Sequence, residues 1–379
     1  MSSYGHLTRR KKVVIIGGGA TGTGVASLAA EAGFEVVLID RGKLGSGTTG
    51  NFHGMLHSGG RYAVNDVSVA AECYQENQRL RQLVPSAIID TGGMFVACDD
   101  TEASHADLIM SSCRQAGIPL EEITVERALQ LEPYLSRGIK RAFLTADAFI
   151  DGAKLIAINR RAGQSSAVPV KFIENHTASG FERNNRRITA VMARDTRSGE
   201  TIKVDCDFVI NAAGVWSGEV AALAEVSLKM IFDKGTMIAF KDRFANRVLN
   251  RARSENDGDL VVPDAQGRSV LGTTARVVSH PDNARPSQEE IDLLIDEGSA
   301  MIPSLATAEV SRVYTGVRPL FDTSGLLVEG QTRAVSRSYH LLDHADQSVD
   351  NFLSIVGGKV TLYRRMAEDT VNLLNAKIT

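Results

Sequence analysis

Cysteine is scarce in this sequence, with only four among 379 residues. Cys73, Cys98, Cys113 and Cys206 lie far apart and form no C-x-x-C pair, so we predict neither a disulfide framework nor an iron–sulfur cluster or other metal site. Isolated cysteines of this kind are typical of buried thiols in a reducing compartment, which favours the cytoplasm.

Long apolar runs and runs of like charge are also missing. No segment reaches the roughly 18 apolar residues of a membrane span, and the basic first 12 residues lead into glycines rather than into the apolar core of a signal peptide. Lysine and arginine are dispersed and the formal net charge is −3, so no nucleic-acid partner is indicated. We expect a cytoplasmic protein without a transmembrane segment, reaching the inner membrane, if at all, through a partner.

Proline is rare, with 9 residues, whereas glycine is abundant, with 34. So many glycines indicate that the backbone approaches something closely at several points. The hydrophobic content of 43% and charged content of 23% are ordinary for a soluble globular protein. A chain of this length is long enough to form two domains.

The first 66 residues predict a βαβ unit followed by a long loop. Lys12–Ile16 is a short buried strand, residues 17–22 (GGGATG) form a turn, Thr23–Ala32 is an alanine-rich helix, and residues 34–40 form a second strand. Residues 41–66 have no periodicity, but they contain histidines and aromatic residues. A segment of this length inside a compact domain is usually a functional loop or disordered, and its composition favours function.

The rest of the chain predicts two interleaved domains. Residues 168–210 resemble a β-meander, and residues 351–378 predict a strand, a glycine turn and a long terminal helix. Further helices are expected at Ser68–Leu83, His105–Ala116, Val125–Leu131 and Gln288–Met301. We predict a cofactor-binding domain from residues 12–90, 150–225 and 345–379, and a substrate-binding domain from residues 91–149 and 226–344.

The first chemical motif is the glycine turn. Gly17, Gly19 and Gly22 follow a strand and open a helix, an arrangement that lets a dinucleotide pyrophosphate approach the helix N-terminus. Asp40 ends the next strand, where it is placed to accept hydrogen bonds from ribose hydroxyls. The alternative is a glycine turn that binds no ligand. The motif alone does not choose between FAD and NAD.

Two later glycine motifs are compatible with the same ligand. Asn211–Gly214 (NAAG) ends a strand with small residues that would let the backbone lie close to a dinucleotide, although plain strand-to-helix packing explains it almost equally well. Gly357 and Gly358 precede Lys359 at the start of the terminal helix. A helix N-terminus with a nearby lysine would stabilise the negative charge of a reduced flavin, whereas an ordinary capped helix does not explain the lysine.

The loop at residues 45–62 supplies hydroxyl groups and imidazoles. Its hydroxyl groups are those of Ser46, Thr48 and Thr49. A structural and a functional role are equally open for His53, because a lone histidine is often structural. His57 lies among glycines beside Arg61 and Tyr62, so its side chain is harder to assign to a core.

Arg318 lies in the motif Thr315–Pro319 (TGVRP), after an apolar strand. Its fixed guanidinium suits a carboxylate or a phosphate of a ligand. The alternative is an internal salt bridge.

Taken together, the segments GGGATGTGVA, TTGNFHGMLHSGGRYAV, TGVRPL, SRSYHLLDHA and GGKVTLYRRMAED resemble the FAD-dependent glycerol-3-phosphate dehydrogenases, a family of the D-amino-acid-oxidase-like flavoproteins. The segments ENQ at Glu76–Gln78 and LLDHA at Leu341–Ala345 are similar to segments of the catalytic subunit of the bacterial anaerobic enzyme. The resemblance spans nearly the whole chain. It implies a mixed α/β fold, with a Rossmann-like FAD-binding domain interleaved with an antiparallel-sheet substrate domain.

The resemblance also implies roles for individual residues. The expected FAD-binding residues are Gly17, Gly19, Ala20, Thr21, Gly22, Asp40, Arg41, Thr48, Thr49, Gly214, Gly358, Lys359, Val360 and Thr361. The expected substrate-binding residues are Arg61, Tyr62, Arg318, Arg337 and Lys359, and the expected catalytic residues are His57, Arg318 and Lys359. The iron–sulfur tail of the anaerobic subunit and the C-terminal helical domain of aerobic relatives have no counterpart before Thr379, which leaves the electron acceptor open.

The implied reaction is oxidation of sn-glycerol 3-phosphate, or another phosphorylated polyol, to the ketone. A hydride passes from the carbinol carbon to flavin N5 and a base takes the hydroxyl proton; His57 is favoured as base because an imidazole titrates near working pH. Arg61, Arg318 and Lys359, held on rigid backbone, would select a phosphate because it carries more charge than a carboxylate. Electrons would pass to a quinone or a partner subunit.

Three alternatives remain open. The first is an oxidase or dehydrogenase with the same fold that acts on 2-hydroxy acids or amino acids. The second is a nicotinamide-dependent dehydrogenase, and the third is a flavin subunit that mainly transfers electrons within a larger complex.

Overall fold

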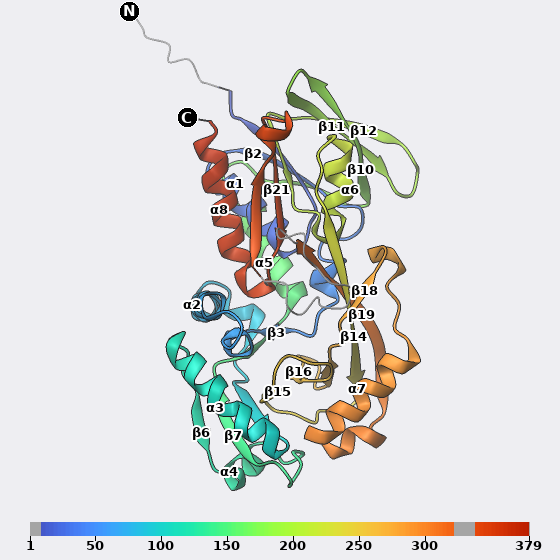
Figure 1. The fold of residues 1–379 in the computed structure, drawn as a ribbon. Helices are drawn as coiled ribbons and strands as arrows, with labels where there is room; N and C mark the ends of the chain where they lie inside the picture. Colours follow the sequence, from blue (N-terminus) through green and yellow to red (C-terminus); the bar gives the residue numbers. More distant parts are fainter. Residues whose placement is uncertain (1–8, 322–337, 379) are drawn as a thin grey trace, which may run out of the picture.

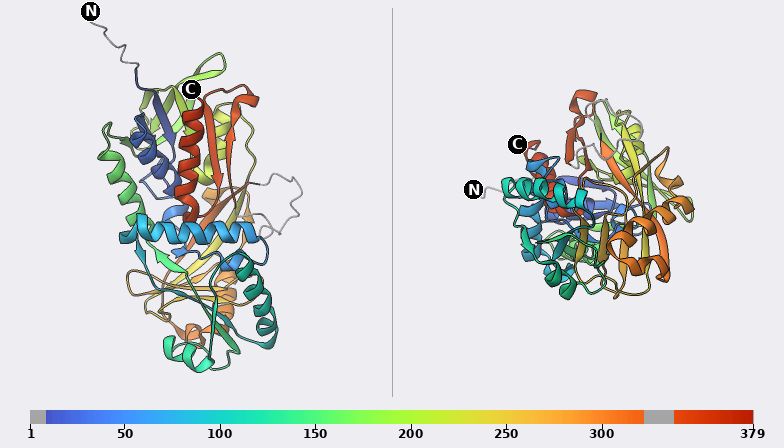
Figure 2. Two further views of the ribbon diagram at one scale, coloured as in Figure 1. Left: turned by 90° about the vertical axis from the view of Figure 1, so that its left-hand side faces the viewer. Right: turned by 60° about the horizontal axis from the view of Figure 1, so that its bottom comes forward.

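The computed structural model describes residues 9–321 and 338–378, which fold into two halves, each built around a large sheet (Figure 1). Figure 2 shows helix α2 (Val67–Leu83) running across the boundary between the halves. Arg337, a predicted substrate-binding residue, lies outside the described residues.

The first sheet has six strands and is parallel except at one edge. The βαβ unit predicted from the sequence forms its centre. The strand order is β20 (Tyr339–Asp343), β21 (Phe352–Gly357), β13 (Phe208–Asn211), β1 (Lys12–Ile16), β2 (Glu35–Ile39) and β9 (Lys171–Ile173). Strand β20 falls in the range predicted for the substrate domain but pairs with β21; the division into domains stays a prediction.

Both faces of this sheet are covered, because successive residues of a strand point to opposite sides. Val13 and Ile15 of β1 pack on the side of helices α1 (Ala20–Glu31) and α8 (Tyr363–Ala376). Val14 and Ile16 pack on the opposite side, against a three-stranded meander. The meander consists of β10 (His176–Asn184), β11 (Arg187–Asp195) and β12 (Thr201–Asp205).

The meander is shorter than the sequence predicted. Residues 168–210 were expected to form one meander, but their first and last strands, β9 and β13, pair with β2 and β1 in the parallel sheet. Hydrophobic alternation gives strand content and not the partner of each strand, so local sequence could not separate the two sheets.

The second sheet has nine strands, and only the β15–β5 pair is parallel. It confirms the predicted antiparallel sheet. Its strands are β18 (Arg276–Val278), β14 (Met230–Phe240), β17 (Ser269–Gly272), β16 (Leu260–Pro263), β15 (Val248–Arg251), β5 (Gly93–Ala97), β7 (Arg141–Thr145) and β6 (Glu121–Ile123), with β19 (Val310–Phe321) on the other side of β14. A small sheet of β3 (Met55–Leu56), β8 (Ala148–Ile150) and β4 (Ile88–Ile89) also forms.

The remaining helices are α3 (Asp100–Gln115), α4 (Val125–Leu131), α5 (Gly152–Gln164), α6 (Ser217–Leu223) and α7 (Gln288–Met301). Helix α1 begins at Ala20 and not at Thr23, because Gly19 is its N-cap and Gly22 lies in its first turn. Helix α5, capped by Asp151, was not predicted.

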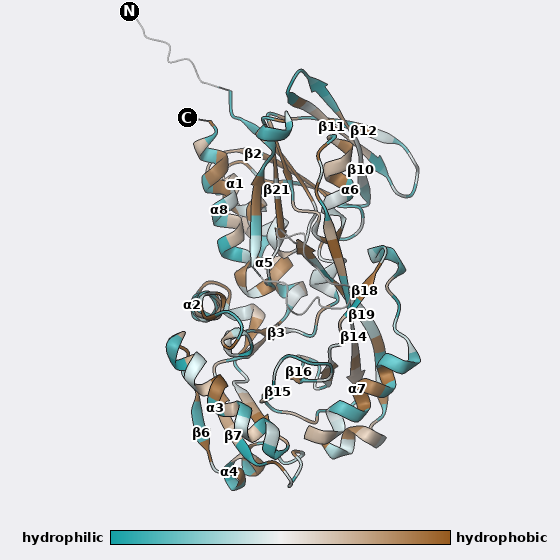
Figure 3. Ribbon diagram, in the orientation of Figure 1, coloured by the Kyte–Doolittle hydropathy of each residue, from teal (hydrophilic) through white to brown (hydrophobic). Residues whose placement is uncertain are grey.

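Helix α8 shows how the pattern of side chains sets packing. Its buried residues are Tyr363, Met366, Ala367, Thr370, Val371 and Leu374, which recur at the three- and four-residue spacing of one helix face. Figure 3 shows the polar opposite face of the same helix. Among residues 9–321 and 338–378, no helix has the length and apolar character needed to cross a membrane.

Candidate functional site

A cavity of about 400 Å³ opens where the parallel strands of the first sheet end. Gly17 follows β1, Asp40 follows β2, Ala212 follows β13, and Gly357 ends β21, and all four line the cavity. The carboxyl ends of parallel strands are the usual ligand site of such sheets. All the predicted cofactor-binding residues line this cavity except Gly22 and Thr361.

The glycine turn at the cavity is tightly packed. A methyl group on Gly17 would lie 2.3 Å from the Ala212 carbonyl oxygen, and one on Gly22 would lie 1.9 Å from the Gly17 carbonyl oxygen. Gly17 has a φ of 107°, a conformation that favours glycine. Gly22 therefore shapes the turn from behind and does not face the cavity.

The N-terminus of α1 points at this cavity without a side-chain cap. Gly19 is the N-cap, and the first turn carries no acidic residue. The Ala20 amide donates to Thr49 Oγ1 at 3.1 Å. Uncapped amides and the helix dipole make this end of the helix a place for an anion.

Asp40 is held in a fixed orientation. Its Oδ2 accepts a hydrogen bond from the Gly18 amide at 2.6 Å, and its Oδ1 accepts one from the Gly42 amide at 2.7 Å. Burial raises the pKa of the Asp40 carboxyl above its ordinary value, although these two hydrogen bonds oppose the shift.

Arg41 and Trp216, which both line the cavity, are joined by a contact with Asp282. The Arg41 guanidinium lies 3.9 Å from the centre of the Trp216 ring. Asp282, in the loop before α7, accepts hydrogen bonds from Arg41 at 2.8 Å and from the Trp216 indole nitrogen at 3.1 Å. Sequence analysis missed Trp216 and Asp282, because nothing local links residues 66 positions apart.

At the other end, three predicted site residues come together. The Lys359 ammonium lies 4.4 Å from the centre of the Tyr62 ring. The Tyr62 hydroxyl lies 3.4 Å from His57 Nε2. Gly357 and Gly358, with φ of 80° and 75°, turn the chain from β21 so that Lys359 lines the cavity.

The backbone of His57 is held from two sides. Its amide donates to Thr361 Oγ1 at 3.2 Å, and its carbonyl accepts from Asn77 Nδ2 at 3.2 Å. Asn77, on α2, is fully buried and also donates to the carbonyls of Leu56 and Ala146. Thr361, predicted to contact the cofactor, therefore positions His57. Asn77 also positions His57, whereas the sequence pointed to it only as part of the family resemblance.

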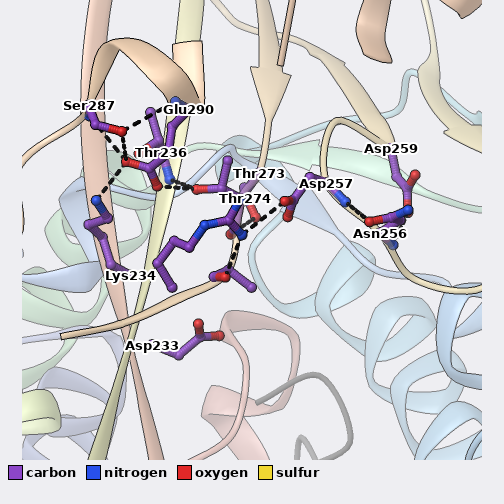
Figure 4. A network of polar contacts seen from close by, with 12 residues as sticks. Asp233, Lys234, Thr236, Asn256, Asp257, Asp259, Thr273, Thr274, Ser287 and Glu290 are labelled. Carbon is purple, nitrogen blue, oxygen red and sulfur yellow. Dashed lines mark hydrogen bonds and ion pairs between the residues drawn. The ribbon is translucent and has the colours of Figure 1, made fainter. Parts of the chain in front are cut away.

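Arg318 is oriented by acceptors on the neighbouring strands. Its guanidinium lies 2.9 Å from Asp233 Oδ2, and it also donates to Thr273 Oγ1 and, at 3.2 Å, to the Thr274 carbonyl. Figure 4 shows the adjacent network, in which Glu290 binds Lys234 and Thr274. Arg318 thus forms an internal salt bridge with Asp233, which was the alternative that the sequence left open.

Among the predicted substrate and catalytic residues, Lys359 lines the cavity, whereas Arg61, His57, Tyr62 and Arg318 are not among the lining residues. The Arg61 guanidinium lies 3.1 Å from Asp259, and both side chains are buried, with 8% and 1% exposed. The prediction of three fixed cations around one anion was therefore incomplete: Arg61 and Arg318 each face a buried carboxylate supplied by a distant segment.

His53 lies beside His57, with ring centres 5.8 Å apart and an interplanar angle of 75°. Its Nδ1 accepts a hydrogen bond from the Met55 amide at 3.1 Å. Burial, followed by the positive charges of Arg318 and Arg61, lowers the pKa of the His53 imidazole to about 3. The ring is thus neutral at ordinary pH.

Comparison with known proteins gives a family match and several relatives. The profile of the family described as "FAD dependent oxidoreductase" matches residues 12–364. "Anaerobic glycerol-3-phosphate dehydrogenase subunit A1" of Haloferax volcanii is 37% identical over 96% of this chain and 63% of its own length. "Glycerol-3-phosphate dehydrogenase 1" of Mycobacterium bovis is 32% identical over 95% of this chain and 72% of its own length. The chain thus spans less than two thirds of the Haloferax relative.

Two solved structures share the fold. Glycine oxidase from Bacillus cereus has a TM-score of 0.79 at 20% identity and covers 97% of this chain and 96% of its own. The glycerol-3-phosphate dehydrogenase from Bacillus halodurans, complexed with FAD, has a TM-score of 0.71 at 21% identity and covers 98% of this chain and 65% of its own. At these identities the likeness shows the fold alone.

Proposed function

This chain belongs to the FAD-dependent oxidoreductase family, in which it groups with glycerol-3-phosphate dehydrogenases, and from that premise we propose that it oxidises sn-glycerol 3-phosphate to dihydroxyacetone phosphate. Family membership selects FAD over NAD as the cofactor. The observation that carries the proposal is a cluster in which Lys359, which lines the dinucleotide cavity, contacts Tyr62, and Tyr62 contacts His57.

The residues around the cavity suit FAD. The uncapped N-terminus of α1 would receive the pyrophosphate, and Asp40 would accept hydrogen bonds from the ribose of the adenosine half. Arg41 and Trp216 would flank the outer end of the cofactor, and Gly358 and Lys359 would lie at the flavin. A methyl group on Gly214 would meet nothing within 4 Å, so the backbone there leaves open space for a ligand.

FAD, when bound, supplies the acceptor for the hydride that leaves the carbinol carbon. His57 takes the hydroxyl proton, since an imidazole is the usual base near neutral pH. Tyr62 contacts the His57 ring, and the side chains of Thr361 and Asn77 form hydrogen bonds with the His57 backbone, so all three hold His57 in place. Lys359 and Arg318 would bind the anionic group of the substrate, with Arg61, which already pairs with Asp259, as a third candidate.

The electron acceptor is part of the proposal. A relative named as a subunit supports a partner protein that receives the electrons, directly or on the way to a quinone. Such a partner would place this protein at the inner membrane while the chain itself stays in the cytoplasm.

The test is anaerobic reduction of the FAD-loaded protein, which is monitored by the loss of flavin absorbance. The panel holds sn-glycerol 3-phosphate, glycerol, lactate, 2-hydroxyglutarate, glycine and proline. We expect rapid bleaching with sn-glycerol 3-phosphate and slow or no bleaching with the others. Faster bleaching by a hydroxy acid or an amino acid would overturn the proposal.

One observation favours that rival. Arg61 and Arg318 each lie against a buried carboxylate, which lowers the net positive charge available to a substrate. A carboxylate with a single negative charge would then be sufficient. The same panel of substrates separates the two.

A further inference from the structure

The proposed function gives His53 no part, although this residue lies beside the proposed base. It is in the loop between the short helical turn Thr48–Gly50 and strand β3, and its side chain is partly exposed. Its ring meets the His57 ring edge to face.

The local backbone fixes the tautomer of His53. Because Nδ1 accepts the Met55 N–H, that nitrogen carries no proton. A neutral ring must then carry its proton on Nε2, which makes this atom a hydrogen-bond donor. Within residues 9–321 and 338–378, Nε2 forms no hydrogen bond.

The surroundings keep this ring neutral. Arg318 from β19 and Arg61 from the turn Gly60–Tyr62 place two positive charges near it, and the other rings beside it are Phe52 and His57. An imidazolium would be repelled by both guanidinium groups. His53 is therefore a poor place to store the proton released in the reaction, and His57 remains the better base.

We propose that His53 is a second imidazole of the active site, which donates its Nε2–H to the substrate oxygen that His57 deprotonates. The proposal rests on the proposed function. The two rings meet edge to face with their centres 5.8 Å apart, so a substrate oxygen bound at His57 has the His53 ring as its immediate neighbour.

In the proposed step the substrate O–H bond would break and its proton would pass to His57, while the C–H bond would break with loss of a hydride, for which bound FAD would be the acceptor, and the carbonyl π bond would form. His53 keeps its proton throughout. A fixed neutral donor stabilises the negative charge that grows on the oxygen as the proton leaves.

The competing interpretation gives His53 only a local role as acceptor for the Met55 amide. Two variants separate the roles. His53→Asn keeps an acceptor near Nδ1 but lacks the distal N–H, whereas His53→Gln can place an N–H near the position of Nε2. FAD content and thermal midpoint serve as folding controls for both.

The first measurement does not depend on the substrate. In FAD-loaded protein with ¹⁵N-labelled histidine, the NMR signals of His53 are assigned by their loss in His53→Asn. We expect the Nε2–H tautomer with no titration between about pH 5.5 and 8.5. The Nδ1–H tautomer, or a titration in that interval, would overturn the proposal.

The second measurement is the limiting rate of flavin reduction by sn-glycerol 3-phosphate under anaerobic conditions. We expect a loss of about 10²-fold in His53→Asn and partial recovery in His53→Gln. A rate in His53→Asn equal to wild type, or equally slow rates in both variants, would support the purely local role. If wild type is not reduced at all, the proposed function fails, while the NMR result still decides the state of His53.

Discussion

Arg318 lies 2.9 Å from Asp233, directly across the pairing of β14 and β19. The Asp233 side chain is fully buried, whereas 28% of the Arg318 side chain is exposed. The guanidinium thus pairs with a buried carboxylate while part of its side chain stays accessible. This contact makes Arg318 both a structural residue and a candidate anion ligand.

Arg318→Ala should lower stability, because it leaves the Asp233 carboxylate buried without this guanidinium. We expect a loss of about 2 kcal/mol, a value reduced from that of a fully buried pair because Arg318 is partly exposed. The double variant Asp233→Asn/Arg318→Ala should recover part of that loss in urea unfolding. Additive losses of Arg318→Ala and Asp233→Asn in the double variant would show that the pair is uncoupled.

Kinetic measurements distinguish the role of Arg318 as an anion ligand from its structural role. In Arg318→Ala, kcat/KM for sn-glycerol 3-phosphate should fall more than kcat/KM for glycerol, by about 2 kcal/mol in transition-state free energy. Glycerol lacks the phosphate and is therefore the internal control. Equal losses for the two substrates would mean that Arg318 acts through folding or chemistry and not through the anion.

Asp40→Ala should weaken FAD binding without changing the substrate preference. The carboxylate is fixed by the amides of Gly18 and Gly42, and the loss of a charge-assisted hydrogen bond to ribose costs about 1.5–3 kcal/mol. Equilibrium dialysis should show a Kd for FAD raised about 10- to 100-fold. Unchanged retention of FAD would exclude Asp40 as the ribose ligand.

Asp282→Ala should speed the release of FAD, since Asp282 joins Arg41 and Trp216, which both line the cavity. The contact is exposed, so we expect a modest effect of about 1 kcal/mol, or roughly fivefold. Trp216 is the only tryptophan of the chain, and its fluorescence reports the release directly. Asp350→Ala, which breaks a comparable ion pair with Arg186, is the control and should leave the rate unchanged.

Stability should depend on pH through His53. The folded pKa of about 3 lies below the ordinary value of 6.5, so between these values the unfolded chain binds a proton that the folded chain does not. Stability therefore rises with pH in this interval, by up to about 1.4 kcal/mol per pH unit. Between pH 7.5 and 5, wild type should lose more stability than His53→Asn in urea unfolding. Parallel curves would contradict a His53 that stays neutral in the folded protein.

The sequence by itself determined the elements whose signals are local. The βαβ start, the glycine turn after β1 and the bounds of helices α4 and α7 follow from hydrophobic spacing and glycine positions, which act within a few residues. Many of the residues that line the cavity, among them Gly17, Asp40 and Gly214, belong to the same motifs, because these motifs follow strands that lie side by side in one sheet.

Only the tertiary structure decided which charges are compensated. Asp233 lies 85 residues from Arg318, and Asp259 lies 198 residues from Arg61, so no local pattern predicted either pair. The state of His53 likewise depends on burial and on two arginines of other elements. Charge, burial and strand pairing are set by neighbours in space, and the fold alone brings those neighbours together.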